Sequence, residues 1–383
     1  MTTATETPAA LREATEHQPS ARAALAAALA DPVHAYLFAG PPGSGKRAAA
    51  RAFAAELIAA DSADPDDARR RALADPSPHP DLVWLAPQGT QHLVEEVRGR
   101  VITAAAYRPF EGERRVFVIE AADAMADESQ NALLKTLEEP AAYVHLVLIT
   151  SEPAALLETV RSRCQPVRFA PLADEAVEAR LAELGLAEDD GERHAAARLA
   201  AGDPNRAAFL VSPDGHALRE AAERCVAAAR SGELADAPWA GLLDAAEAAG
   251  AQAGEAARER LASLDVAGGE DSGPAARRRE REAIDTARRV ARRARTEALD
   301  LGLALITAWL RDLAAVAEDA GDLLLNTDRA GELAKLAGGL DGRRARRGAE
   351  LVMETRRRLQ VNVAEELALE ALVFRLEALL RDA

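Results

Sequence analysis

The chain has 383 residues, 49% of them hydrophobic and 29% charged, which is the composition of a globular protein with two or three domains. The net charge of −16 argues against a protein that coats nucleic acid by itself, although it permits a local basic strip. Two cysteines, Cys164 and Cys225, far apart in sequence, support neither a disulfide framework nor a zinc site. No apolar run is long enough to span a bilayer and the polar start does not resemble a signal peptide, so we expect a cytoplasmic protein with no membrane partner.

The first half of the chain alternates strand-like with helix-like segments. Four short apolar runs have the length and composition of buried parallel strands: 35–40, 81–87, 114–122 and 144–151. Three segments with helical character lie between them: 46–60, 93–107 and 128–139. Repeated strand and helix units predict an α/β P-loop domain with a parallel sheet over residues 1–170.

Beyond residue 170 the strand-like pattern stops and helical sequence takes over. Residues 171–212 have the pattern of a small helical domain, and residues 213–383 that of a larger one whose helices have broad apolar faces suited to oligomer packing. Three breaks interrupt the larger part: 232–240, 267–276 and 337–344. The second break is rich in glycine and acidic residues, which predicts a flexible loop.

The stretch "GPPGSGKR" at 40–47 follows the first predicted strand and precedes a helix. Gly40, Gly45 and Lys46 match the pattern G-x-x-x-x-G-K-[ST], in which backbone N–H groups turn toward a phosphate and the lysine reaches the β- and γ-phosphates. A plain Gly/Pro turn between strand and helix is the alternative. We predict that ATP or ADP binds to the following loop residues: Gly40, Pro41, Pro42, Gly43, Ser44, Gly45, Lys46 and Arg47.

Two positions depart from the chemistry of ATP hydrolysis. Arg47 stands where a hydroxyl normally holds the magnesium ion that accompanies ATP. At the end of the 114–122 run, Glu120 and Ala121 stand where an Asp that organises magnesium and a Glu that orients water are needed. Losing a positioned base typically costs about 10²- to 10⁴-fold in rate, and Asp123 would need an unusual backbone path to replace it. We therefore predict nucleotide contact at Glu120 without efficient hydrolysis, and we predict no metal ligands.

Three motifs occur in order before the helical C-terminal part: "GPPGSGK" at 40–46, "NALLKTLEEP" at 131–140 and "VRSRCQPVRF" at 160–169. In this combination the chain resembles the clamp-loader branch of the AAA+ proteins, which includes the delta-prime and gamma/tau subunits of bacterial DNA polymerase III. The likeness covers most of the chain but is loose over 213–300. It implies an AAA+ nucleotide domain, a helical lid and an all-α collar.

The resemblance also implies roles for single residues. Arg163, in Ser162-Arg163-Cys164, matches an arginine finger that reaches the γ-phosphate of ATP on a neighbouring subunit, where a guanidinium neutralises charge on the transferred group. Thr150 matches a polar sensor and Arg206 a second sensor that touches the nucleotide. The alternatives are a surface arginine for Arg163, an N-cap for Thr150 and a solvated arginine for Arg206. Cys164 is expected to be a small buried residue and not a nucleophile.

The departures at Arg47 and Ala121 make the chain more similar to delta-prime than to gamma/tau. Delta-prime keeps the arginine finger but has lost the residues for its own ATP hydrolysis. The implied protein is a stator of a five-subunit clamp loader, not itself catalytic, whose partners are the gamma/tau and delta subunits, the sliding clamp and, through the complex, primer–template DNA. Two alternatives stay open: a gamma/tau-like ATPase motor with Glu120 as its carboxylate, and a non-replicative P-loop scaffold. Residues 59–81, where the family often carries a zinc module, contain no cysteine, so no zinc is expected.

The segment 277–295 holds nine arginines and three acidic residues. Its arginine-rich face opposes an apolar face with helical spacing: Ile284, Ala287, Ala291, Ala294 and Ala298. A solvated helix face is the first interpretation. A surface for DNA or a partner is the second, although the strip lacks aromatic residues for base stacking.

Overall fold

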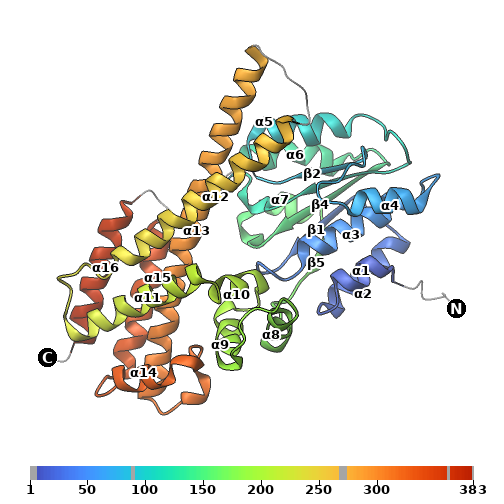
Figure 1. Ribbon diagram of the computed structural model, residues 1–383. Helices are drawn as coiled ribbons and strands as arrows, with labels where there is room; N and C mark the ends of the chain where they lie inside the picture. Colours follow the sequence, from blue (N-terminus) through green and yellow to red (C-terminus); the bar gives the residue numbers. More distant parts are fainter. Residues whose placement is uncertain (1–6, 88–90, 267–273, 360–362, 382–383) are drawn as a thin grey trace. The chain divides into compact units, whose positions relative to one another are not determined.

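The structure, a computed structural model, describes residues 7–87, 91–266, 274–359 and 363–381, with no description of the side chains at 261, 263–266, 274–280 and 282. The chain divides into two compact units, 1–172 and 173–383 (Figure 1). No described helix combines the length and the apolar character required to cross a bilayer.

The N-terminal unit is built on a five-stranded sheet in the order β2-β3-β4-β1-β5, in which all paired strands are parallel. Four strands lie within the predicted apolar runs, which confirms them: β1 (Ala35–Ala39), β2 (Leu82–Leu85), β3 (Arg115–Ile119) and β4 (Val144–Thr150). The fifth strand, β5 (Gln165–Arg168), was not predicted. It is an edge strand in which only Val167 is buried, so it lacks an apolar run, and the edge position tolerates Pro166.

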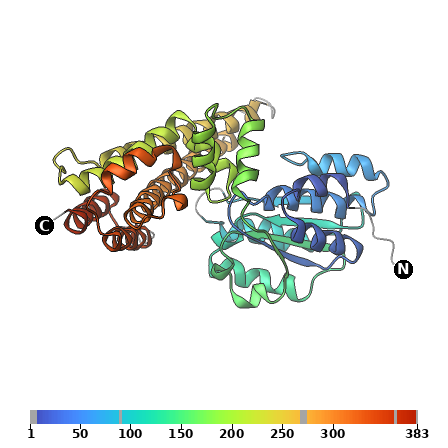
Figure 2. The same ribbon diagram turned by 90° about the horizontal axis from the view of Figure 1, so that it is seen from below.

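Helices cover both faces of this sheet (Figure 2). On one face, Tyr36 and Phe38 of β1 pack with apolar residues of α1 (Ala9–Ala14), α2 (Pro19–Ala30), α3 (Lys46–Ala59) and α4 (Pro65–Leu73). On the other face, Leu37 packs with residues of the π-helical turn Val97–Thr103 after α5 (Val94–Glu96), and of α6 (Asp127–Glu138) and α7 (Glu158–Arg161). The many buried alanines of α3 let this helix lie close to the sheet, as a sequence poor in aromatic residues requires.

The C-terminal unit consists of helices, as predicted. They are α8 (Asp174–Glu183), α9 (Asp190–Ala200), α10 (Pro204–Leu210), α11 (Pro213–Ser231), α12 (Ala240–Val266), α13 (Pro274–Ala317), α14 (Ala330–Leu336), α15 (Gly342–Leu359) and α16 (Glu365–Leu380). The predicted break at 232–240 falls between α11 and α12, which begins at its last residue, Ala240. The break at 337–344 is confirmed only for 337–341, since 342–344 already belong to α15. Of the break at 267–276, residues 267–273 lie outside the described residues and 274–276 belong to α13. The division into a lid and a collar at residue 212 stays a prediction.

Helices α12 and α13 pair in opposite directions, and two glycines of α12 allow their close approach. A Cβ added at Gly250 would lie 2.9 Å from the Ala291 carbonyl oxygen, and one at Gly254 would lie 3.0 Å from the Ala291 Cβ. The predicted apolar face of α13 is buried at Ala287 and Ala298, while Ile284 remains 38% exposed. Small residues on both helices thus form the seam.

Three of the arginines in the strip at 277–295 form ion pairs within the C-terminal unit: Arg288, Arg293 and Arg295. Arg295 binds Glu365 and, through Nε at 3.0 Å, Glu247, and Arg293 pairs with Glu297 at 2.7 Å. These pairs agree with a solvated helix face whose charge is partly neutralised within the unit. The arginine side chains at 277–279 lie outside the described residues, so a DNA-facing role for the strip stays a prediction.

Candidate nucleotide site and arginine finger

The predicted phosphate loop leaves β1, between β4 and β5 in the sheet, and leads directly into α3. The Gly40 N–H donates to the Thr150 carbonyl at 3.3 Å. A Cβ at Gly40 would lie 2.3 Å from the Phe169 carbonyl oxygen, so only glycine lets the loop pass the end of β5. Gly43 and Gly45 have φ angles of 72° and 86°, the left-handed conformation that glycine adopts without strain. The glycines of the motif therefore stand where the backbone requires them.

Lys46 is folded back over this loop and is only 6% exposed. Its Nζ donates to the carbonyl oxygens of Gly40 and Pro41, both at 2.5 Å. The Ser44 and Ser151 hydroxyl oxygens lie 3.4 and 3.5 Å from the same nitrogen. The ammonium group is thus held by carbonyl oxygens of the loop, beside the N-terminus of α3, and its contact with a phosphate stays a prediction.

The loop is braced by a residue that the sequence did not single out. The Gln18 side chain, 5% exposed, donates to the Ser44 carbonyl at 3.2 Å and to the Ala170 carbonyl at 2.7 Å. Its Oε1 accepts the Ala170 N–H at 3.0 Å. Gln18 therefore ties the loop to the segment that follows β5. Its place just before Pro19, at the start of α2, resembles an ordinary helix cap and gave no separate signal.

Thr150 and Asp123 meet at the end of β4. The fully buried Thr150 hydroxyl donates to Asp123 Oδ1 at 2.6 Å, and the Ser151 N–H donates to the same oxygen at 3.1 Å. Thr150 Oγ1 also accepts the Glu152 N–H at 3.0 Å. Asp123 therefore orders the backbone beside Ser151, whose hydroxyl is near Lys46. The proposed sensor role of Thr150 stays a prediction.

Arg47 and Glu120, the two residues at the positions associated with magnesium, bind each other. Arg47 Nε lies 3.1 Å from Glu120 Oε2, and the Trp84 indole N–H donates to that same oxygen at 3.0 Å. Arg47 also pairs with Asp75 at 3.0 Å, and Arg51 pairs with the other oxygen of Asp75 at 2.9 Å. Partial burial lowers the pKa of Arg47, but the Glu120 and Asp75 carboxylates outweigh it and the pKa is raised.

Magnesium does not fit these residues. The ion requires oxygen ligands in a near-octahedral arrangement at about 2.0–2.1 Å, and Arg47 supplies a cation in place of a hydroxyl oxygen. Glu120 Oε2 already accepts from Arg47 and Trp84. The two carboxylates of this cluster are balanced by two guanidinium groups, which leaves no net negative charge to attract a dication.

The position expected to orient water carries no functional side chain. Ala121 adopts a left-handed backbone conformation with φ of 49° and is followed by the 3₁₀ turn Ala122–Ala124. A methyl group cannot accept a proton. Glu120 is further fixed by His92, whose Nε2 lies 2.7 Å from the Glu120 carbonyl oxygen. The cluster can hold charges in place, but it offers no general base at the second position.

Arg163 follows α7 and is held by two acceptors. Its Nη1 donates to the Thr159 carbonyl at 2.8 Å, and its Nη2 lies 2.5 Å from Glu138 Oε1 on α6. The side chain is 35% exposed. The next residue, Cys164, is buried, and burial raises the pKa of its thiol to about 12, so the expectation that Cys164 is a small buried residue is confirmed. The structure thus pairs Arg163 with α6 and not with the loop at 40–47.

Arg206 lies on α10 in the C-terminal unit. Its backbone N–H donates to Oδ1 of Asp203, the N-cap of this helix, at 3.4 Å. This capping contact fixes the start of α10 and involves only the backbone of Arg206. Contact between Arg206 and a nucleotide stays a prediction.

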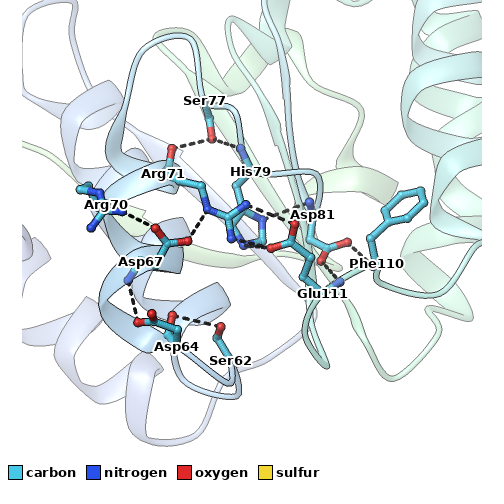
Figure 3. A network of polar contacts seen from close by, with 10 residues as sticks. All are labelled: Ser62, Asp64, Asp67, Arg70, Arg71, Ser77, His79, Asp81, Phe110 and Glu111. Atoms are coloured by element: carbon cyan, nitrogen blue, oxygen red, sulfur yellow. Dashed lines mark hydrogen bonds and ion pairs between the residues drawn. The ribbon is translucent and has the colours of Figure 1, made fainter.

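A second polar cluster occupies 59–81, the segment without cysteines (Figure 3). Arg71 binds Asp67 at 2.7 Å and both carboxylate oxygens of Glu111 at 3.2 and 2.5 Å. The fully buried Asp81 accepts the N–H groups of Phe110 and Glu111 at 2.7 and 2.9 Å. These contacts fasten α4 to the segment before β3. The cluster therefore has a structural explanation, and the absence of zinc stays an expectation.

Comparisons with known proteins agree with the geometry of the N-terminal unit. The family model described as "DNA polymerase III, delta subunit" matches residues 18–173, which include the loop, the sheet and Arg163. The delta-prime subunit of DNA polymerase III from Bacillus subtilis is 36% identical over 39% of this chain and 46% of its own length. Over this N-terminal unit the chain is similar to delta-prime subunits of DNA polymerase III. The N-terminal unit has the parallel α/β sheet with a glycine-rich loop after β1 that the sequence predicted, and helices follow it.

Two further relatives are similar to this chain over a comparable part of its length. The Escherichia coli delta-prime subunit is 38% identical over 44% of this chain and 49% of its own length. The Mycobacterium tuberculosis gamma/tau subunit is 34% identical over 45% of this chain and 31% of its own length. The matches with these curated relatives therefore span less than half of each relative's length.

Proposed function

We propose that the chain is the delta-prime subunit of a DNA polymerase III clamp loader. In this role it contacts nucleotide without hydrolysing it efficiently, and it supplies Arg163 to the ATP site of a neighbouring subunit while the sliding clamp is loaded onto primed DNA. The proposed partners are the gamma/tau and delta subunits, the clamp and, through the assembled complex, primer–template DNA.

This proposal rests on the partial exposure of Arg163 and on its ion pair with Glu138. Its guanidinium is partly exposed and is positioned by Glu138, which is itself 48% exposed. An ion pair between exposed groups contributes only about 0–1 kcal/mol, so a triphosphate on a neighbouring subunit can replace Glu138 as the partner. Arginine suits this role because its planar fork matches phosphate oxygens in a bidentate way.

The cluster around Arg47 supports the assignment to a non-hydrolysing subunit. Glu120 is bound by Arg47 and Trp84, and Ala121 provides no base. The gamma/tau relatives nevertheless match at 34% identity, so an ATPase motor is the second candidate. Steady-state ATP hydrolysis by the purified chain separates the two. We expect at most a residual rate, whereas turnover comparable with that of an assembled clamp loader supports the motor.

Membership in the complex is tested by isolating it. The tagged full chain is purified from its native cell under gentle conditions, and the bound proteins are identified by mass spectrometry. We expect gamma/tau, delta and the sliding clamp. If these proteins are absent while other stoichiometric partners are present, the replicative assignment is wrong and a non-replicative scaffold replaces it.

A further inference from the structure

We propose that the phosphate loop binds a nucleoside diphosphate or triphosphate without a divalent cation, and that the Arg47 guanidinium supplies the positive charge in place of magnesium. This inference rests on the proposed nucleotide contact and specifies its chemistry. The residues around Arg47 fit magnesium poorly, because they already bind one another.

Arg47 is held where it adjoins the phosphate position. It is the second residue of α3, directly after Lys46, so its backbone belongs to the helix N-terminus that forms the site. Its fork contacts carboxylates from two other segments, Glu120 after β3 and Asp75 before β2. The guanidinium carbon also lies 5.6 Å from the centre of the Trp84 ring. Three contacts from separate parts of the fold thus keep one cation close to the loop.

The cluster can release Arg47 without leaving Asp75 or Glu120 unpartnered. Arg51, one turn further along α3, pairs with Asp75 at 2.9 Å and lies 4.4 Å from the centre of the Trp84 ring. Trp84 itself donates to Glu120 at 3.0 Å. The Arg47 side chain is 52% exposed, so it has room to turn toward a phosphate group in the loop. Asp75 would keep Arg51 as its donor, and Glu120 would keep Trp84.

The same cluster disfavours a nucleotide that arrives with magnesium. In an ordinary P-loop the ion sits beside a hydroxyl and a free carboxylate. Here it would meet the charged Arg47 and a carboxylate that is already paired. Like charges at close range repel, and an uncomplexed nucleotide presents more negative charge to Lys46 and Arg47 than a magnesium complex does. Magnesium should therefore weaken binding or leave it unchanged.

The test measures the affinity of the full chain for a fluorescent ADP analogue, once in excess EDTA and once in excess magnesium. We expect wild-type protein to bind at least as tightly in EDTA. In Arg47→Ser a hydroxyl replaces the cation and Glu120 loses its ion pair while keeping the Trp84 hydrogen bond, so magnesium should tighten binding about fivefold or more. Arg47→Lys is the matched control because it keeps the cation, and magnesium should not tighten its binding. Circular dichroism verifies that each variant is folded.

The outcomes distinguish this inference from the function on which it rests. Wild-type binding that magnesium tightens overturns the inference and leaves the nucleotide contact intact, as does an Arg47→Ser variant that magnesium does not affect. No binding by wild-type protein in either medium overturns the nucleotide contact itself. Lys46→Ala provides the reference for that case, since it should lose affinity in both media.

Discussion

Replacing Gly40 by alanine tests the packing on which the loop depends. The new Cβ would lie 2.3 Å from the Phe169 carbonyl oxygen and 2.8 Å from the Phe169 Cβ. The first of these atoms is backbone and cannot rotate away, so the loop and β5 must separate. Gly40 does not have a positive φ angle, so alanine causes no backbone strain there. The loss of stability therefore comes from steric overlap.

Overpacking of this kind typically costs about 1–3 kcal/mol. For a unit the size of 1–172, each kcal/mol lowers the melting temperature by about 2–4 °C. The separation should also disturb the contacts of Gly40 with Thr150 and Lys46, so affinity for nucleotide should fall.

The assay is thermal unfolding of the full chain followed by circular dichroism. Gly99→Ala is the matched control, because its Cβ meets nothing within 4 Å and it lies in the π-helical turn. The control should be neutral or stabilising by about 0.5–1 kcal/mol. A Gly40→Ala variant as stable as wild-type protein would refute the reasoning.

Two further predictions concern pH and thiol chemistry. Hydrogen bonds from Arg71 hold the pKa of Glu111 below its usual value of 4.5, so this pair stabilises the fold above the unfolded pKa and the contribution is lost as the pH falls through the folded pKa. The test is urea unfolding at a series of pH values below 4.5. As the pH falls, the free energy of unfolding should decrease less for Arg71→Met than for wild-type protein, and parallel pH profiles of the two proteins would contradict this. Burial raises the pKa of Cys164 and Cys225 to about 12 each. A disulfide reagent at pH 8 should thus label neither thiol in the folded chain and both in urea, whereas rapid labelling without urea would contradict the described burial.

The sequence predicted the parts of the fold whose signal is local. Strands β1, β3 and β4 were visible because a parallel strand buried on both faces appears as a continuous apolar run. The edge strand β2 is only partly buried, but its four residues are all apolar. The edge strand β5 has exposed Gln165, Pro166 and Arg168, and only its pairing with β1 identifies it. The helical character of the C-terminal part was predicted for the same local reason, from periodicity.

The site was predicted only where a motif encodes it. The loop at 40–47 follows a known spacing, so its glycines and Lys46 could be named in advance. Asp75, Trp84 and Gln18 could not, because they reach the loop and the Arg47 cluster through tertiary packing and have no spacing relation to them. Asp123 was considered as a substitute carboxylate, and the structure instead gives it the hydrogen bonds that order Thr150 and Ser151.

The central claim is that Arg163 completes the ATP site of a neighbouring subunit. The most direct measurement is ATP hydrolysis by a reconstituted clamp loader that contains wild-type chain, Arg163→Ala or Arg161→Ala, with assembly verified by size-exclusion chromatography. Arg161 is the matched control, since it is an exposed arginine on α7 two residues away. We predict that Arg163→Ala assembles normally but hydrolyses ATP more slowly, because one site loses its finger, while Arg161→Ala retains the wild-type rate. An assembled Arg163→Ala complex with unchanged hydrolysis would contradict the account.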